Sequence, residues 1–321
     1  MASSLLAQGH FVEAERILRE VYAADLKVLR AEHPATLAVM GTLAHALLEQ
    51  GKYGEAEILQ RDALAVERRV LGSEHPVVLG STGNLAMSLS SQGKFAEAER
   101  LLRESQDVLE RVLGPDHPST TTNASNLAHT LSSQGKHAES EKIFRTVHAV
   151  ETRVLGVEHP ATLRSTGNLA QAIASQGMYA EAERMERELL KVTTRVLGAE
   201  HPGTLTTAGN LASSLKQLGK FNEAEKMERD LLAREKRLLG EEHPTTLTTA
   251  GNLAGTLFCQ KRFSEAERIQ RDLLEKYERV LGPDHPSTTT NASNLANTLS
   301  SQGKYAESEK IFRTGHAVET R

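Results

Sequence analysis

The chain has 321 residues, 25% of them charged, and a formal net charge of -4. This balance argues against a nucleic-acid groove or an anionic membrane surface as partner, because both require an excess of lysine and arginine. The single cysteine cannot form an intrachain disulfide, no stretch approaches the roughly 18 apolar residues of a membrane span, and the N-terminus has no signal-peptide pattern. We therefore expect a cytoplasmic protein with no nucleic-acid or membrane partner.

The sequence repeats itself every 42 residues. His-Pro dipeptides begin at His33, His75, His117, His159, His201, His243 and His285. The tripeptide Asn-Leu-Ala recurs at the same interval, and a Glu-x-Glu step recurs in eight copies. Because a period of roughly 20–50 residues is typical of a solenoid, we expect one continuous array over residues 1–321. It holds about seven and a half 42-residue repeats and is truncated at both ends.

Each repeat contains the signals of two helices. Pro76 suits a first helical turn, and apolar residues form one stripe from Pro76 to Gln92, which predicts helix A. Gly93-Lys94 breaks the pattern, and a second stripe from Phe95 to Leu113 predicts helix B. Gly114 then predicts a left-handed cap. One such hairpin cannot bury its own apolar stripe, so stacking on neighbouring repeats is obligatory.

Two further periodic features belong to helix B. The first is a ring after the Gly-Lys turn, which we expect to pack in the core between repeats: Phe11, Tyr53, Phe95, His137, Tyr179, Phe221, Phe263 and Tyr305. The second is a glutamate four residues before an arginine, which we interpret as a solvated outer face that contributes ~0.2–0.5 kcal/mol per pair. The pairs are Glu15/Arg19, Glu57/Arg61, Glu99/Arg103, Glu141/Arg145, Glu183/Arg187, Glu225/Arg229, Glu267/Arg271 and Glu309/Arg313.

These motifs together resemble a known repeat family. The strings are Asn84-Leu85-Ala86-x-x-Leu89, Gln92-Gly93-Lys94-Phe95-x-Glu97-Ala98-Glu99 and Arg111-Val112-Leu113-Gly114-x-x-His117-Pro118. They resemble the long tetratricopeptide repeat (TPR) of kinesin light chains over essentially the whole chain. Similar arrays occur in nephrocystin-3-like proteins and as sensor regions of nucleotide-binding, NLR-like proteins of fungi and bacteria. The resemblance implies an all-α, right-handed α-solenoid of tandem antiparallel helix-turn-helix units, whose concave wall is built by helix A and receives peptides or proteins.

The candidate site is a stripe on helix A beside its packing face. It contains one asparagine per repeat, a set that we call the Asn ladder: Asn84, Asn126, Asn168, Asn210, Asn252 and Asn294. Each carboxamide offers two donors and an acceptor to the backbone of an extended peptide. The alternative is that each asparagine bonds a neighbouring helix and fixes the stacking.

Other residues of this stripe refine the expectation. Glycine precedes the asparagine at Gly83, Gly167, Gly209 and Gly251. In the first repeat Gly41 precedes Thr42, which replaces the asparagine. Glycine inside a helix costs ~1 kcal/mol relative to alanine, so either a neighbouring helix or a ligand must approach closely there. His129, Gln171 and Arg164 complete the predicted groove. Clustered lysine and arginine are missing from it, so the ligand is not expected to be strongly acidic.

Neither catalysis nor metal binding is expected. The periodic histidines fall one per repeat, roughly a helix-packing distance of 10 Å apart, whereas zinc ligands lie ~2 Å from one ion. We interpret them as caps of helix A. No phosphate-binding loop, paired-His motif or nucleophile elbow occurs, so no cofactor is expected.

The sequence therefore predicts a scaffold that binds protein or peptide partners. The alternative is the sensor arm of an NLR-like, nucleotide-dependent switch whose ATPase domain lies outside this chain. The array has no capping helix at either end, which indicates either a longer host protein or end-to-end self-association.

Overall fold

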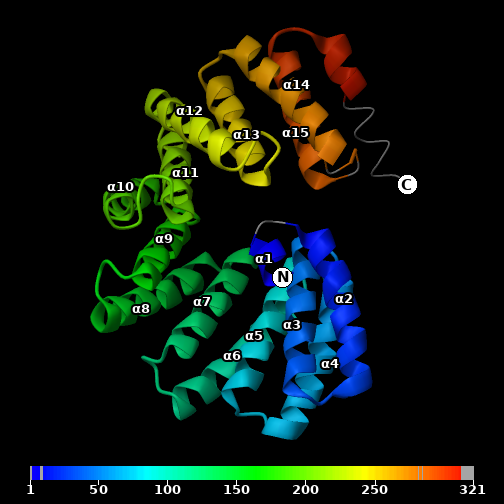
Figure 1. Cartoon of the computed structure of the whole chain (residues 1–321). Helices are drawn as coiled ribbons and strands as arrows, with labels where there is room; N and C mark the ends of the chain where they lie inside the picture. The colour runs from blue at the N-terminus through cyan, green and yellow to red at the C-terminus, as the bar shows by residue number, and fades with distance from the viewer. Residues whose placement is uncertain (1, 8–9, 281, 284, 312–321) are drawn as a thin grey trace. The chain divides into compact units, whose positions relative to one another are not determined.

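The structure, a computed structural model, describes residues 2–7, 10–280, 282–283 and 285–311, and its helices are labelled in Figure 1. All regular structure in these residues is α-helical: α1 (Ala2–Ala7), α2 (Phe11–Val28), α3 (Pro34–Glu49), α4 (Tyr53–Leu71), α5 (Pro76–Ser91), α6 (Phe95–Val112), α7 (Pro118–Ser133), α8 (His137–Leu155), α9 (Pro160–Ala174), α10 (Tyr179–Val196), α11 (Pro202–Gln217), α12 (Phe221–Leu238), α13 (Pro244–Cys259), α14 (Phe263–Val280) and α15 (Pro286–Ser301). The odd-numbered helices from α3 onward are the predicted A helices, and the even-numbered ones are the B helices.

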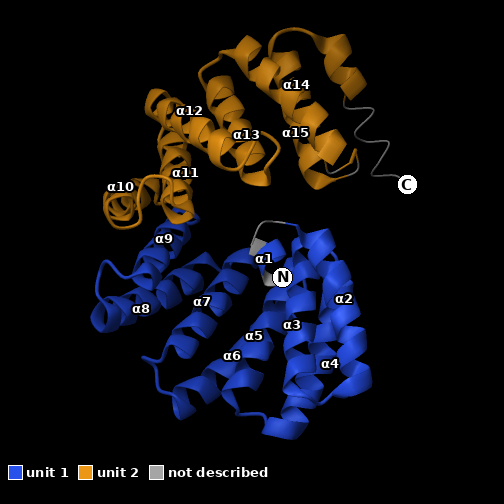
Figure 2. Ribbon diagram, viewed as in Figure 1, with its two compact units in different colours: residues 1–176 blue, residues 177–321 orange. Residues whose placement is uncertain are grey.

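The chain forms two compact units, residues 1–176 and residues 177–321 (Figure 2). In the first unit each helix from α1 to α9 packs on the next along the chain. In the second unit the same holds from α10 to α15. Some A helices also contact each other directly, as α5 and α7 do in the first unit. The prediction of tandem antiparallel helix-turn-helix repeats is confirmed within each unit.

The His-Pro dipeptide begins each A helix from α3 onward. Proline occupies the first turn, and the histidine before it has extended backbone angles, such as φ -67° and ψ 137° at His75. Its Nδ1 atom accepts the backbone N–H two residues on, at 3.1–3.3 Å in all seven copies. This bond satisfies one of the amide groups that a helix start leaves unpaired. The prediction of a capping histidine is confirmed.

Glycine is favoured at both turns of the repeat because the backbone there has positive φ. Gly93, between helices A and B, has φ 75°, and Gly72, after helix B, has φ 85° with ψ 154°. The prediction of a left-handed cap after helix B is confirmed, since Gly114 has φ 88°. Arg30 and Lys261 have φ values of 71° and 62°, although neither residue is glycine.

The core consists of leucine and alanine from both helices of each repeat. One cluster joins Leu85 and Leu89 of α5 to Ala98 and Leu102 of α6, all at most 2% exposed. Ala98 and its equivalents Ala14, Ala56, Ala182, Ala224 and Ala266 are fully buried, which fits close helix packing. The ring that begins helix B is not part of the core.

The prediction that these rings pack in the core is wrong. Phe95 is only half-buried, Tyr53 is 36% exposed and Tyr305 is 71% exposed. The reason is the position of the ring. It belongs to the first residue of helix B, so one of its sides lies against a turn and not against a second helix.

The solvated outer face predicted for the Glu–Arg pairs is also wrong, because the glutamate is nearly buried. Glu57 is 9% exposed and accepts Nε of Arg61 at 2.9 Å within its own helix. It also accepts Nε2 of Gln92 at 2.8 Å and Nζ of Lys94 at 2.7 Å, both from the next repeat. The Lys94 ammonium, opposed by burial and helped by Gln92 and Arg61, lowers the pKa of Glu57 to about 2.

The arginine completes this contact between repeats. Nη2 of Arg61 donates to Glu97 at 2.8 Å, the first glutamate of the next Glu-x-Glu step. The same arrangement surrounds Glu15, Glu99 and Glu267. The Gln-Gly-Lys and Glu-x-Glu strings thus join consecutive repeats through a polar cluster. We call one of these clusters the Glu57 clasp; it consists of Glu57, Arg61, Gln92, Lys94 and Glu97. In the eighth pair, Arg313 lies outside the described residues.

Candidate functional site

The Asn ladder lies at one repeated position on the A helices α5 to α15. Asn84 and Asn294 are exposed, and the other four are half-buried. Backbone oxygens of Asn84, Asn126 and Asn294 accept hydroxyl groups one turn on, but among the described residues none of the six carboxamides makes a hydrogen bond. The alternative in which each asparagine bonds a neighbouring helix is therefore not what the structure shows. The amides are open to solvent or to a ligand.

The glycine beside each asparagine is not required by close packing. A Cβ atom built on Gly83 would lie 3.7 Å from Nδ2 of Asn126, which is ordinary van der Waals contact. At Gly209 and Gly251 the nearest atoms would be leucine methyl groups at 3.6 and 3.9 Å, and at Gly41 nothing lies within 4 Å. The prediction that a neighbouring helix approaches closely is therefore wrong at these four positions. Ligand access remains open at Gly41, which is exposed, whereas Gly83 is buried. Gly167 is half-buried.

The remaining predicted groove residues lie on α7 and α9. Arg164 and Gln171 are exposed on α9. His129 is exposed on α7, where its ring meets the buried ring of Phe144 edge-on, with centroids 4.9 Å apart. These side chains belong to the same helix face as the Asn ladder, as the helical spacing predicts.

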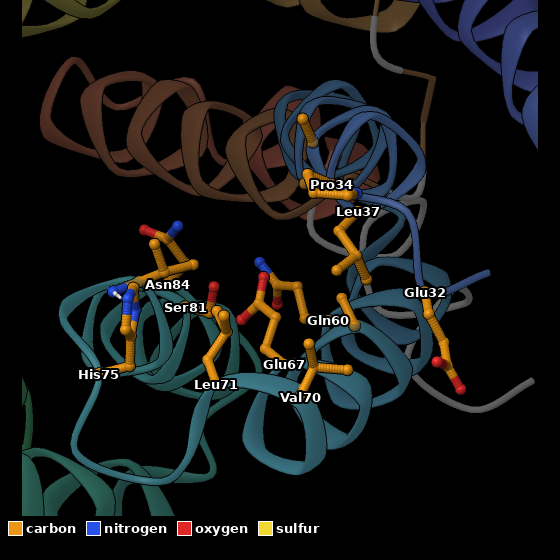
Figure 3. A pocket seen from close by; sticks show the side chains of 14 residues that line it. Glu32, Pro34, Leu37, Gln60, Glu67, Val70, Leu71, His75, Ser81 and Asn84 are labelled. Carbon is orange, nitrogen blue, oxygen red and sulfur yellow. Dashed lines mark hydrogen bonds between the residues drawn. The ribbon is translucent and has the colours of Figure 1, made fainter. Parts of the chain in front are cut away.

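A pocket of 490 Å³ opens between α3, α4 and α5 (Figure 3). The A helices contribute Gly41 and Asn84, so the pocket is continuous with the predicted groove. Helix α4 forms its floor and contributes Gln60, Ala63 and Glu67. The volume is in the range of ~300–1,000 Å³ that is usual for ligand sites.

The sequence analysis missed the polar residues of this floor. Glu67 is 6% exposed, and its Oε2 has no hydrogen-bond partner. Gln60 is 9% exposed, and its Oε1 accepts Oγ of Ser88 at 2.5 Å. Figure 3 shows both polar groups directed into the space between α3 and α5. One signal was available, since Gln60 and Glu67 occupy positions that the next repeat fills with Leu102 and Leu109.

The second unit buries carboxyl groups at the position of Gln60. Glu186 and Glu228 are each 2% exposed. Burial raises the pKa of both to about 7, against the hydroxyls of Ser214 and Thr256, which lower it. Burial also raises the pKa of Glu235, which is 1% exposed. In all three groups burial favours the neutral form, in contrast to Glu57, whose pKa the Lys94 ammonium lowers.

The described part of the chain contains neither a candidate metal site nor a candidate membrane span. No group of three or more His, Cys, Asp or Glu side chains is placed to hold a metal ion. No helix there is both long enough and apolar enough to cross a membrane.

Comparison with solved structures finds the same fold elsewhere. An array of nearly identical TPR-like repeats from a kinesin light chain of Podosopora anserina is 28% identical, with a TM-score of 0.56 over 64% of this chain and 97% of that one. The apo quorum sensor NprR of B. thuringiensis is 12% identical, with a TM-score of 0.70 over 99% and 85%. A signal transduction ATPase (STAND) with a tetratricopeptide repeat sensor from Pyrococcus horikoshii is 14% identical, with a TM-score of 0.62 over 95% and 46%.

The sequence itself places the chain in a family. No curated protein matches it. The model of a tetratricopeptide repeat matches residues 1–69, 43–111, 77–139, 120–193, 175–234 and 245–318, which together cover most of the sequence. The chain belongs to the tetratricopeptide repeat family.

Proposed function

We propose that the array is a scaffold that binds a peptide or protein partner along its A helices, with the Asn ladder as the contact surface. The observation that carries the proposal is that the six carboxamides have no hydrogen-bond partner within the described residues, although they recur at one position in every repeat from α5 onward. A side-chain amide can donate to a backbone carbonyl and accept from a backbone N–H at once. It therefore suits the main chain of an extended ligand, whatever its sequence.

The glycines beside the ladder support this role. Four of them have room for a methyl group, yet glycine lowers helix propensity by ~1 kcal/mol relative to alanine. Gly41 is exposed and has nothing within 4 Å of its Cβ position, so the free space over its backbone gives a ligand access that a side chain would reduce. The cost in stability is then offset by binding, not by packing.

The charges of the groove indicate the class of partner. Its predicted cation, Arg164, is a single residue on α9, and the floor of its pocket carries the carboxylate of Glu67. A strongly acidic ligand would meet Glu67 without a cluster of basic side chains to offset it. We therefore propose a ligand that is neutral or basic.

Neighbouring structures support two settings for such binding. One is a Rap protein solved with competence and sporulation factor, at 11% identity and a TM-score of 0.60. The other is the STAND protein, of which this chain spans about half the length. The second candidate function is accordingly the sensor arm of a nucleotide-dependent switch. A phosphate-binding loop encoded upstream in the same reading frame would decide for the sensor arm.

The main test is co-purification followed by mass spectrometry. The full chain is compared with a variant that carries Asn126→Ala, Asn168→Ala and Asn210→Ala, with circular dichroism to check folding. Asn222→Ala, an exposed asparagine at the start of α12, is the control. We expect the triple variant to fold and lose partners that the control retains. Retention of every partner by a folded triple variant contradicts the proposal.

Self-association is tested separately by sedimentation of the isolated chain. A concentration-dependent rise in mass supports end-to-end stacking, and a strict monomer at high concentration argues against it.

A further inference from the structure

The pocket between α3, α4 and α5 has an unbalanced negative charge. Its lining includes two carboxylates, Glu32 and Glu67, and none of the described lysine or arginine residues. Glu32 is exposed and pairs with Arg69. His75, which also lines the pocket, caps α5 by accepting the amide of Val77 at Nδ1. Glu67 is the carboxylate that no cation offsets.

Glu67 is placed as a recognition group. It is 94% buried, and its side chain makes no hydrogen bond or ion pair within the described residues. An isolated buried carboxylate is costly unless a charged donor meets it, so the site is incomplete as the chain stands alone. The acceptors around it are Oε1 of Gln60, which has one lone pair left after Ser88, and Oδ1 of Asn84 on the opposite wall.

Comparison of the repeats shows why the pocket opens here. Glu151 and Glu235 occupy the position of Glu67 two and four repeats later, and each also has an Oε2 without a hydrogen-bond partner. One helical turn before them lie Val147 and Leu231, where the repeat of Glu67 has Ala63. The smaller side chain leaves space above α4, so this carboxylate alone of the three lines the pocket (Figure 3).

We infer that this pocket takes an arginine side chain of the peptide partner, with Glu67 as its counter-ion. A guanidinium presents five donors in a planar fork and binds a carboxylate through two parallel hydrogen bonds, which matches a carboxylate with no other partner. The apolar walls of Leu37, Ala38 and Val77 suit the aliphatic stem. Asn84 lines both this pocket and the groove, so the peptide main chain would lie on the Asn ladder while the side chain enters. The inference thus rests on the proposed function.

The test measures, by NMR titration, the binding of the peptide Ac-Ala-Ala-Arg-Ala-Ala-NH2 to the full chain. Its counterpart with citrulline, which has the same shape without the charge, is the matched ligand. Two variants address the site: Glu67→Leu removes the charge, and Ala63→Leu fills the space. Both introduce residues that other repeats carry at these positions, Leu109 and Leu231, so folding is expected. Glu151→Gln removes an equivalent buried carboxylate outside the pocket and is the control.

We expect the arginine peptide to bind the native chain and the Glu151→Gln control alike, and to bind both Glu67→Leu and Ala63→Leu at least about tenfold more weakly. Equal binding of the citrulline peptide, or full binding to Ala63→Leu, overturns the inference. If agmatine, a free guanidinium compound, binds as tightly as the arginine peptide, the inference that the cation comes from a peptide is overturned. If the arginine peptide binds at Glu67 but the Asn ladder substitutions leave partner capture unchanged, the proposed function alone is overturned. If those substitutions abolish partner capture but the arginine peptide does not bind at Glu67, the pocket inference alone is overturned.

Discussion

Nζ of Lys94 lies 2.7 Å from Oε2 of Glu57, and the two residues belong to different repeats. The glutamate is nearly buried, whereas the lysine side chain is half-exposed. Since Arg61 and Gln92 donate to the same carboxylate, one anionic group satisfies donors from both repeats. The cluster therefore depends on this glutamate, because removal of the anion leaves several donors without a partner.

The first prediction concerns this clasp. Glu57→Gln should lower the free energy of unfolding by about 1–3 kcal/mol, because it removes the charge that Lys94 and Arg61 share. Thermal unfolding followed by circular dichroism measures the change. The control is Glu104→Gln, whose partner Arg100 lies at 2.9 Å with both side chains 59% exposed. It should cost no more than ~0.5 kcal/mol. Equal effects from the two substitutions would show that the clasp adds nothing to an ordinary surface pair.

The second prediction is loss of stability in acid. The Lys94 ammonium, against burial, lowers the pKa of Glu57 to about 2, and Lys52 and Lys136 do the same for Glu15 and Glu99. A folded-state pKa below the unfolded value of 4.5 contributes stability that is present above pH 4.5 and is lost as pH falls toward 2. Urea unfolding at stepped pH should show this decline. In Glu57→Gln the slope should be shallower, and an unchanged slope contradicts the assignment.

A third prediction has the opposite sign and concerns Glu228. Burial raises its pKa to about 7, so the folded chain holds a proton that the unfolded chain releases above pH 4.5. This contribution to stability is complete below pH 4.5 and is lost as pH rises through 7. Glu228→Gln should therefore stabilise the chain at pH 8, by up to about 3 kcal/mol, and change little at pH 4.5. The measurement is the urea midpoint at both pH values, and destabilisation at pH 8 is the contradictory result.

The repeat architecture follows from the sequence because its signals are local. The His75-Pro76 cap, the Gly93 turn and the apolar stripe of α5 each depend on residues within one or two turns of each other. The six asparagines of the Asn ladder could be placed on one shared face of the A helices for the same reason, since helical spacing alone fixes which residues share a face.

The polar contacts of helix B could not be found in this way. Arg61 lies four residues after Glu57, and this spacing alone indicates an ordinary surface pair. The other two partners of Glu57, Gln92 and Lys94, lie 35 and 37 residues along the chain. Whether Glu67 faces solvent or a pocket depends on how α3 and α5 cover α4, and on the size of Ala63. Tertiary packing decides both, and the sequence of one helix does not contain it.

A fourth prediction concerns the turn before α14. Lys261 has φ 62°, whereas the equivalent Gly219 has φ 73°. The left-handed region costs a residue with a Cβ roughly 1–2 kcal/mol. Lys261→Gly should therefore raise the free energy of unfolding by roughly 1 kcal/mol, and Gly219→Ala should lower it by a similar amount. Chemical denaturation of the two variants checks both signs, and a destabilised Lys261→Gly would show that the lysine side chain contributes more than its backbone conformation costs.

The last prediction separates stability from binding at Gly41, which is exposed on α3. Nothing lies within 4 Å of a Cβ atom built there, so Gly41→Ala should be accommodated and should stabilise α3 by up to ~1 kcal/mol through helix propensity. If a ligand uses the space over this backbone, the same substitution should weaken partner capture while the melting temperature rises. Gly54→Ala, in α4 with nothing within 4 Å of its Cβ, is the control that gains stability away from the A helices. A Gly41→Ala chain that gains stability and keeps full capture would show that this glycine serves neither packing nor ligand, and the groove would then have to be sought along another face of the A helices.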